Sequence, residues 1–480
     1  MNVVPLPPGP ARWPMFGNSF MMPLTYAHIF YKELGKKLGT KIIYLEAAGQ
    51  PVIVLNDIEI AQELLEKRSA LYSSRPQSRM LVEVIGFHAL FGMMPYGDEW
   101  RMQRRIFQQG FSEKTLPMLQ EKGLEFVRKA LLANLLVSPD QLYDHVRNYV
   151  GGFSTSMVYG LPVQRQRDPL VKFAEDTFIK MIAAGGPGKY LVNVFAPLKY
   201  VPEWMPGAGF KKEAKEMSKQ FNQLMEDPFQ RTVKSMEDGT ASPSFVADSL
   251  ETSAHGLEAE LLARYVKQIG VQAFGGEKFF IFLLQDVLLT TRNITAAFET
   301  SVAAIMTFIL AMLLHPDVQH KAQREVDTVV GPDRLPDFTD MPHFTYLSAV
   351  VKEVLSAMLY DEEVFPKPSE FNPERFLSDS GEIREDLPDP ERVATFGFGR
   401  RICPGAHIAR SVIYIAVASM LHLFDISPSC DEEGNPISVI PRFTGASLSS
   451  EPLPFPCKVT PRGGKDVAGL LKEFTGTDPI

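Results

Sequence analysis

The chain has 480 residues and a net charge of −8, with 45% hydrophobic and 22% charged residues. This composition excludes a disordered or fibrous protein and argues against general nucleic-acid binding, and the length suffices for a large core. The three cysteines, Cys403, Cys430 and Cys457, are too few and too scattered for a disulfide framework or a paired-cysteine zinc site. Any cysteine chemistry therefore rests on one residue acting alone.

No secretion signal or membrane span is evident in the sequence. The prolines between residues 5 and 14 are not preceded by the apolar core of a signal peptide. No run reaches the roughly eighteen apolar residues that a spanning helix needs. The nearest runs, 279–284 and 302–314, are predicted to be core helices. We therefore expect a soluble or at most peripherally attached chain.

Periodicity predicts a mainly α fold with a minor β part. Residues 41–55 predict two short strands with a turn at 49–51, and Asp57 can cap the helix that follows. Most segments from about residue 100 to residue 314 have helical patterns. Residues 365–401 are rich in proline, glycine and charge, which predicts an unusually long coil. A helix is expected from Pro404 to about Phe424, followed by turns and short strands.

The coil leads into a ten-residue motif, Phe-Gly-Phe-Gly-Arg-Arg-Ile-Cys-Pro-Gly, at residues 396–405. Its glycines permit tight turns, and Pro404 favours the first turn of a helix, which would place Cys403 at a helix N-terminus. The partial positive charge there stabilises a thiolate, the form of cysteine that binds iron. An isolated Cys-Pro-Gly is more often a small buried cysteine before a helix. The extended pattern favours a ligand, and it includes Phe396, Gly399, Arg401 and Gly405.

This motif resembles that of the cytochromes P-450, the haem-thiolate monooxygenases. The resemblance implies that Cys403 is the proximal ligand of haem b iron, with a thiolate that favours O–O cleavage. It also implies that Phe396 packs against the haem beside the sulfur, that Arg401 reaches a haem propionate and that Gly405 belongs to the cofactor site.

Two further motifs fit the same family. Trp100 and Arg104 are four residues apart and share a helical face. Alone, such a pair is more often a surface contact, but it resembles the family's second propionate site, where a guanidinium and an indole N–H bind the carboxylate. Residues 296–300, Ala-Ala-Phe-Glu-Thr, resemble the oxygen-activating helix, although the same residues are common on ordinary helices. There, Thr300 would bind dioxygen and Glu299 would relay protons.

The resemblance covers nearly the whole chain, and three departures stand out. The first is the start of the chain, which resembles the proline hinge that follows a membrane anchor. We expect residues 1–25 to form this hinge without an anchor and residues 26–480 to form the monooxygenase domain. The family is normally tethered to the cytosolic face of the endoplasmic reticulum, whereas this chain has no spanning segment.

The other two departures are an apparent insertion and an apparent deletion. Residues 277–296 have no counterpart in the family, and their excision would restore a continuous oxygen-activating helix, which suggests a retained intron or a misplaced exon boundary. Glu353 begins the family's Glu-x-x-Arg motif, but Ser356 replaces the arginine and the following segment is missing. Arg375 is then the remaining partner of Glu353. A buried Glu353 that lacks a partner is expected to cost about 3–5 kcal/mol.

The implied function is insertion of one oxygen atom from dioxygen into a small apolar substrate. Stretches such as EWMPGAGFKKEAKEM resemble fungal enzymes of secondary metabolism, which suggests a terpenoid or polyketide. NADPH would act only through a separate reductase, because the chain has no dinucleotide fingerprint, and Arg400 could face that reductase. The alternative is an impaired haem-binding relative or the product of a faulty gene prediction. A zinc hydrolase is disfavoured, because the chain has no His-Glu-x-x-His and the spacing of His315 and His320 does not suit one helical face.

Overall fold

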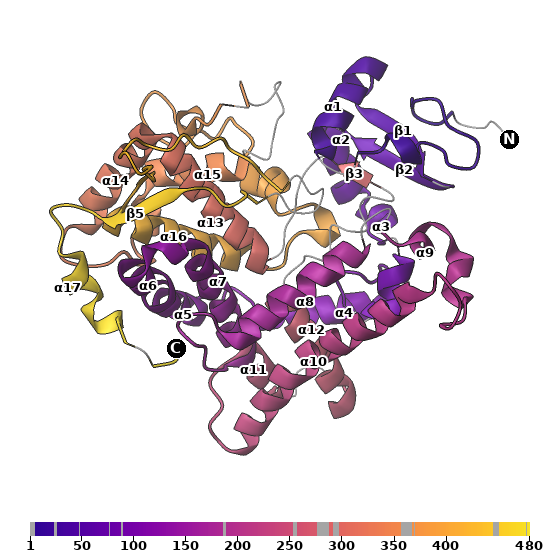
Figure 1. Cartoon of the computed structure of the whole chain (residues 1–480), viewed down its shortest axis with the longest axis horizontal. Coiled ribbons are helices and arrows are strands. Elements are labelled where there is room, and N and C mark those ends of the chain that lie inside the picture. The colour runs from indigo at the N-terminus through magenta and orange to yellow at the C-terminus, as the bar shows by residue number, and fades with distance from the viewer. Residues whose placement is uncertain are drawn as a thin grey trace.

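Helices dominate the computed structural model, and strands occur in two small sheets (Figure 1). The structure describes residues 5–23, 26–47, 49–75, 77–87, 90–185, 189–252, 257–275, 288–290, 297–356, 367–368, 370–444, 451–476 and 478–480. The mainly α fold with a minor β part that the sequence predicts is confirmed.

The helices and strands follow one another along the chain with few long interruptions. The helices are α1 (Ala27–Leu38), α2 (Ile58–Gln62), α3 (Ser69–Tyr72), α4 (Asp98–Gly110), α5 (Leu116–Phe126), α6 (Ala133–Val137), α7 (Leu142–Tyr159), α8 (Pro169–Gly185), α9 (Leu191–Val194), α10 (Gly209–Glu237), α11 (Phe245–Glu251), α12 (Ala259–Gly275), α13 (Ala297–Leu314), α14 (Pro316–Val330), α15 (Thr345–Ser356), α16 (Ala406–Leu423) and α17 (Val467–Leu471). The strands are β1 (Ile42–Ala47), β2 (Gln50–Leu55), β3 (Leu288–Thr290), β4 (Phe424–Pro428) and β5 (Cys457–Pro461).

The N-terminal sheet has a small core of its own. Strands β1 and β2 are antiparallel, and their alternating apolar residues pack with Tyr31 of α1 to form this core. Asp57 caps α2, since its Oδ1 accepts a hydrogen bond from the Ile60 N–H at 2.9 Å. The two strands and the cap are therefore confirmed, whereas the predicted turn at 49–51 is corrected, because Gln50 and Pro51 already belong to β2. The sequence did not predict β3, which pairs with β2 in parallel although it belongs to the apparent insertion at 277–296.

Helices α13 and α16 cross the main core, where α13 packs against α7 and α16. The run 302–314 is confirmed as core helix, because nearly all of its apolar side chains are buried. The run 279–284 lies outside the described residues. Among the described helices, α16 is long and apolar enough to cross a membrane, but 83% of it is buried inside the protein. A helix buried to this extent is typical of a protein core.

The long coil precedes α16, as the sequence predicts, and its described residues form an isolated β-bridge between Leu377 and Ile383 and several short helical turns. These turns are η12 (Pro373–Phe376), η13 (Glu391–Thr395) and η14 (Gly399–Arg401). After α16 the chain enters β4, which pairs antiparallel with β5. Helix α16 packs against α13 and α14, the coil contacts α15 through η12 and η13, and β5 joins this body through β4 and α6 (Figure 1).

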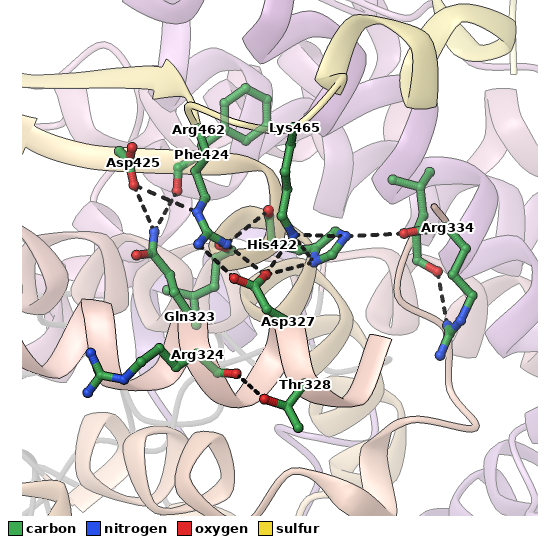
Figure 2. Close-up of polar contacts among 12 residues, drawn as sticks. Gln323, Arg324, Asp327, Thr328, Arg334, His422, Phe424, Asp425, Arg462 and Lys465 are labelled. Carbon is green, nitrogen blue, oxygen red and sulfur yellow. Dashed lines mark hydrogen bonds and ion pairs between the residues drawn. The ribbon is translucent and has the colours of Figure 1, made fainter. Parts of the chain in front are cut away.

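A partly buried polar cluster around the buried His422 fastens the C-terminal segment to this body (Figure 2). The Asp327 carboxylate of α14 accepts hydrogen bonds from both terminal nitrogens of Arg462, at 2.9 and 2.8 Å, and from Lys465 Nζ at 2.6 Å. Lys465 Nζ also donates to His422 Nδ1 at 2.8 Å, and His422 Nε2 lies 3.1 Å from the Arg334 carbonyl. This geometry requires a neutral His422 that donates from Nε2 and accepts at Nδ1.

The cluster makes stability depend on pH. Burial, aided by the charge of Lys465, lowers the pKa of His422 from 6.5 to about 4. Between these values the unfolded chain binds a proton that the folded chain does not. The free energy of unfolding therefore falls by ~3 kcal/mol as the pH drops from 6.5 toward 4.

Chemical denaturation across this pH range checks the prediction. His422→Gln keeps a donor and an acceptor but does not titrate, so its free energy of unfolding should fall less steeply with pH than that of the original chain. His320→Gln, which changes an exposed histidine, is the matched control and should retain the original slope. Equal slopes for His422→Gln and the original chain would contradict the assignment.

Candidate functional site

The loop before α16 is closed by hydrogen bonds of its own backbone. The Cys403 N–H donates to the Phe396 carbonyl at 2.7 Å, and the Ile402 N–H donates to the Gly399 carbonyl at 3.1 Å. Gly399 has φ +52°, and a Cβ at this position would lie 2.1 Å from the Leu65 carbonyl oxygen. Only glycine can therefore occupy position 399 without moving the backbone.

The loop presents Cys403 in a half-buried position, outside any disulfide. The sequence placed Cys403 at a helix N-terminus with Pro404 in the first turn, and this detail is corrected. Helix α16 begins at Ala406 with Gly405 as its N-cap, so Cys403 precedes the helix by three positions. Residues 404–405 form the turn that leads from the closed loop into the helix, and Gly405 has φ −100°, a value that other residues also adopt.

A second set of functional side chains comes from α4. Trp100 and Arg104 are buried on one face of this helix, as the spacing predicts. Arg104 donates from Nη2 to the Ile402 carbonyl, which joins α4 to the cysteine loop. Arg401 enters the same cluster from the loop, with its Cζ 4.5 Å from the centre of the Trp100 ring. Sequence motifs some three hundred residues apart are therefore adjacent in space.

Arg401 also holds the segment that precedes α4. Its guanidinium donates to the carbonyls of Ser73 at 2.7 Å, Phe91 at 3.1 Å and Met94 at 2.7 Å. These three acceptors are backbone groups, so no sequence motif identifies them. Arg401 thus ties residues 73–94 to the cysteine loop, a role that the sequence did not predict.

The cluster offers a hydrogen-bond donor that suits an anion. Trp100 Nε1 is buried and has no hydrogen-bond partner among the described residues. A buried donor without a partner costs about 1–3 kcal/mol. The guanidinium groups of Arg104 and Arg401 flank the same indole ring. This arrangement of donor and cations suits a carboxylate. At Gly405, a Cβ would meet no atom within 4 Å, which leaves space beside the loop.

The proposed oxygen-activating residues lie at the start of α13. Thr300 is half-buried on its first turns, and Glu299 precedes it in the same helix. The side chain of Glu299 and the residue Ala296 lie outside the described part of the chain. The helical placement of both predicted residues is confirmed, and their roles remain predictions.

The Glu353 carboxylate has more hydrogen-bond donors around it than the sequence predicts. Its carboxylate, with 4% of the side chain exposed, accepts from Arg375 Nε at 2.9 Å and from the Asn372 N–H at 2.8 Å. The sequence predicts a loss of stability because Glu353 lacks the arginine of its motif. This prediction is corrected, because the backbone N–H of Asn372 in the coil supplies a second hydrogen-bond donor. Arg375 in turn donates to the carbonyls of Lys367 and Glu370, so the pair holds the beginning of the coil on α15.

Comparison with known families identifies this arrangement. The family model of cytochrome P-450 matches residues 7–355 and 354–453. The chain belongs to the cytochrome P-450 family. The two matched pieces meet at Leu355, one residue before the point where the sequence departs from the family's Glu-x-x-Arg motif.

Similar curated proteins are fungal cytochrome P-450 monooxygenases. Monooxygenase 98 of Postia placenta is 35% identical over 497 positions, which cover 96% of this chain and 91% of the relative. Monooxygenase ple1 of Rhodocybe pseudopiperita is 34% identical, covering 95% of this chain and 90% of the relative. The tryptamine 4-monooxygenase of Psilocybe cyanescens is 31% identical, covering 98% and 95%. The chain is thus similar to monooxygenases along its whole length.

The cytochrome P-450 family implies haem ligated by a cysteine thiolate, and the residues present fit this group. Cys403 would supply the thiolate, and the unpartnered Trp100 N–H with its two flanking guanidinium groups suits a propionate. The open space beside Gly405 agrees with a large flat group lying against the loop. Haem bound through a thiolate supplies the chemistry of dioxygen activation.

Proposed function

We propose that this cytochrome P-450 oxidises a small apolar substrate, a terpenoid or polyketide, in fungal secondary metabolism. The observation that carries the proposal is the convergence of the closed Cys403 loop with Trp100 and Arg104 of α4. The similar fungal monooxygenases support the same reaction class.

In this proposal each residue has a limited task. Cys403 would bind the iron of haem b, and Trp100 with Arg104 and Arg401 would hold a propionate. Phe396 would pack against the haem. Thr300 would hold a proton at its Oγ1, and Glu299 would move protons toward that atom. The apolar face of α13 excludes water from the substrate side.

Electrons come from NADPH through a separate reductase that docks near the cysteine loop. Arg400 is exposed at this surface, where its guanidinium lies 4.9 Å from the ring centre of Tyr96. This positive group beside the loop supports a partner of negative charge. The proposal includes peripheral attachment at the cytosolic face of the endoplasmic reticulum, with residues 1–25 as the hinge and residues 26–480 as the enzyme.

A second candidate is an impaired chain that binds haem weakly. It is favoured by Ser356 and by the family match, which is broken into two pieces at Leu355. The alignment with the Postia placenta relative has 497 positions although it covers only 96% of a 480-residue chain, so it contains positions that this chain lacks. We attribute the break to a segment lost after Leu355, and residues 277–296 to an insertion.

The experiment compares two purified proteins. One has the unchanged sequence. The other, the restored chain, lacks residues 277–296 and carries the corresponding segment of the Postia placenta relative inserted after Leu355. The fraction of protein with a thiolate-type Soret band in the reduced carbon monoxide complex is measured for each. We expect a roughly tenfold higher fraction in the restored chain, because the coil then has its full set of anchors.

The outcomes separate the two candidates. Full occupancy in the unchanged chain would contradict the impaired candidate and leave the monooxygenase. Absence of a thiolate-type band from both proteins would contradict the haem-thiolate proposal itself.

A further inference from the structure

We propose that Glu391 and Arg410 are positioning residues for the cysteine loop, a role that rests on the proposed function. Neither residue belongs to the motifs through which the sequence resembles the family. Both lie outside the propionate cluster, on the side of the loop where Phe396 is buried.

The first step of the argument is the contact between Arg410 and Phe396. Arg410 is in the first turns of α16, and its Cζ lies 5.2 Å from the centre of the Phe396 ring. The planar guanidinium can cover an aromatic face, which an ammonium group does less well. Phe396 is 8% exposed, so this cover is part of its buried environment.

The second step is the ion pair that fixes Arg410. Arg410 Nε pairs with Glu391 Oε2, and the Glu391 side chain is 8% exposed against 37% for Arg410. Burial raises the pKa of Glu391, and the charges of Arg410 and Lys352 oppose that rise. A buried carboxylate of this kind needs its cation, so the guanidinium is held in place over the ring.

The third step connects Glu391 to the rest of the fold. Glu391 begins the turn η13, and its N–H donates to Asp389 Oδ1 at 3.1 Å. Asp389 pairs with Lys352 of α15 at 2.8 Å. Lys352 is the neighbour of Glu353, whose pair with Arg375 holds the beginning of the same coil. Helix α15 therefore anchors the coil at two points, one near its beginning and one at Asp389.

The last step leads to the sulfur. The Phe396 carbonyl accepts the Cys403 N–H at 2.7 Å, so a shift of Phe396 moves the residue that carries the ligand. The path runs from α15 through Asp389, Glu391 and Arg410 to Phe396. Glu391 and Arg410 thus set the position of Cys403 without touching it.

Hydrogen exchange of the full chain tests this role independently of haem. Glu391→Gln keeps the shape but removes the charge that holds Arg410. Exchange at the backbone amides of residues 396–403 should rise roughly tenfold, while exchange in α7 and α13 stays unchanged. Arg410→Lys keeps the charge but loses the planar group over Phe396, and it should give a smaller rise confined to the same amides.

Asp340→Asn is the matched control. Asp340 is 5% exposed and pairs with Arg334, which is 44% exposed, so the two ion pairs have similar burial. This variant should leave residues 396–403 unchanged. Unchanged exchange at these amides in Arg410→Lys and Glu391→Gln, or an equal rise throughout the chain, would overturn the positioning role. If Glu391→Gln fails to fold, exchange at residues 396–403 in Arg410→Lys is compared with that in Asp340→Asn, and this comparison alone tests the positioning role.

A second readout separates this inference from the proposed function. In the restored, haem-loaded chain, Glu391→Gln should convert part of the thiolate-type Soret band of the carbon monoxide complex to the thiol-type band. A local rise in exchange without any haem band would support the positioning role and count against the proposed function. A full thiolate-type band with unaltered exchange would support the proposed function and count against the positioning role.

Discussion

Cys403→Ser is expected to abolish the thiolate-type Soret band of the restored chain completely. A serine hydroxyl has nearly the size of the thiol but does not ionise under these conditions, so it cannot replace the ligand. The loop itself should survive, because its closing hydrogen bond runs from the backbone N–H of residue 403 to the Phe396 carbonyl. The loss would then report ligation rather than folding.

The other two cysteines provide matched controls. Cys430 is exposed, and burial raises the pKa of Cys457 to about 11, which keeps that thiol protonated at neutral pH. Cys430→Ser and Cys457→Ser should therefore retain the band. Retention of a full thiolate-type band by Cys403→Ser, with circular dichroism unchanged in all three variants, would refute the assignment of the ligand.

Glu353→Gln is expected to reduce the free energy of unfolding by about 3–5 kcal/mol. Both oxygens of Glu353 accept hydrogen bonds, one from Arg375 Nε and one from the Asn372 N–H. An amide presents an N–H to one of these donors and leaves the charge of Arg375, which is 8% exposed, without its partner. The beginning of the coil would then detach from α15.

Urea denaturation of the variant and a neighbouring control measures this effect. Glu374→Gln alters the adjacent carboxylate, which is exposed and pairs with Lys321 at the surface. Its expected change is at most about 1 kcal/mol, as for other exposed pairs. Similar changes in the two variants would show that the buried pair of Glu353 does not hold the coil.

Sequence patterns predicted those elements of the fold that interactions between neighbouring residues determine. The alternation in residues 41–55 gives the two strands because one face of each packs against α1, and Asp57 caps the next helix through its own neighbours. The long coil and the helix after it follow from proline, glycine and periodicity. The start of α16 was misplaced by two residues, because Pro404 is compatible with both a first turn and a preceding loop.

The candidate site was predicted in its motif residues but not in their supports. Family motifs identified Trp100, Arg104 and Cys403, and the structure brings Trp100 and Arg104 to the cysteine loop. The carbonyls held by Arg401 and the pair of Glu391 with Arg410 join segments distant in sequence. No periodicity or spacing encodes such contacts. Strand β3 was missed for the same reason, since its partner β2 lies more than two hundred residues earlier.

Gly399 and Gly405, two of the three glycines in the cysteine loop, are constrained by different surroundings. At position 399 a side chain collides with the Leu65 carbonyl whether or not haem is bound, whereas at position 405 it meets open space. In lineages that abandon the cofactor but keep the folded protein, selection therefore relaxes at 405 and persists at 399. A gene that has stopped making a folded protein would drift at both. Substitutions at positions 399 and 405 thus distinguish a gene whose folded protein no longer uses the cofactor from a gene that no longer encodes a folded protein.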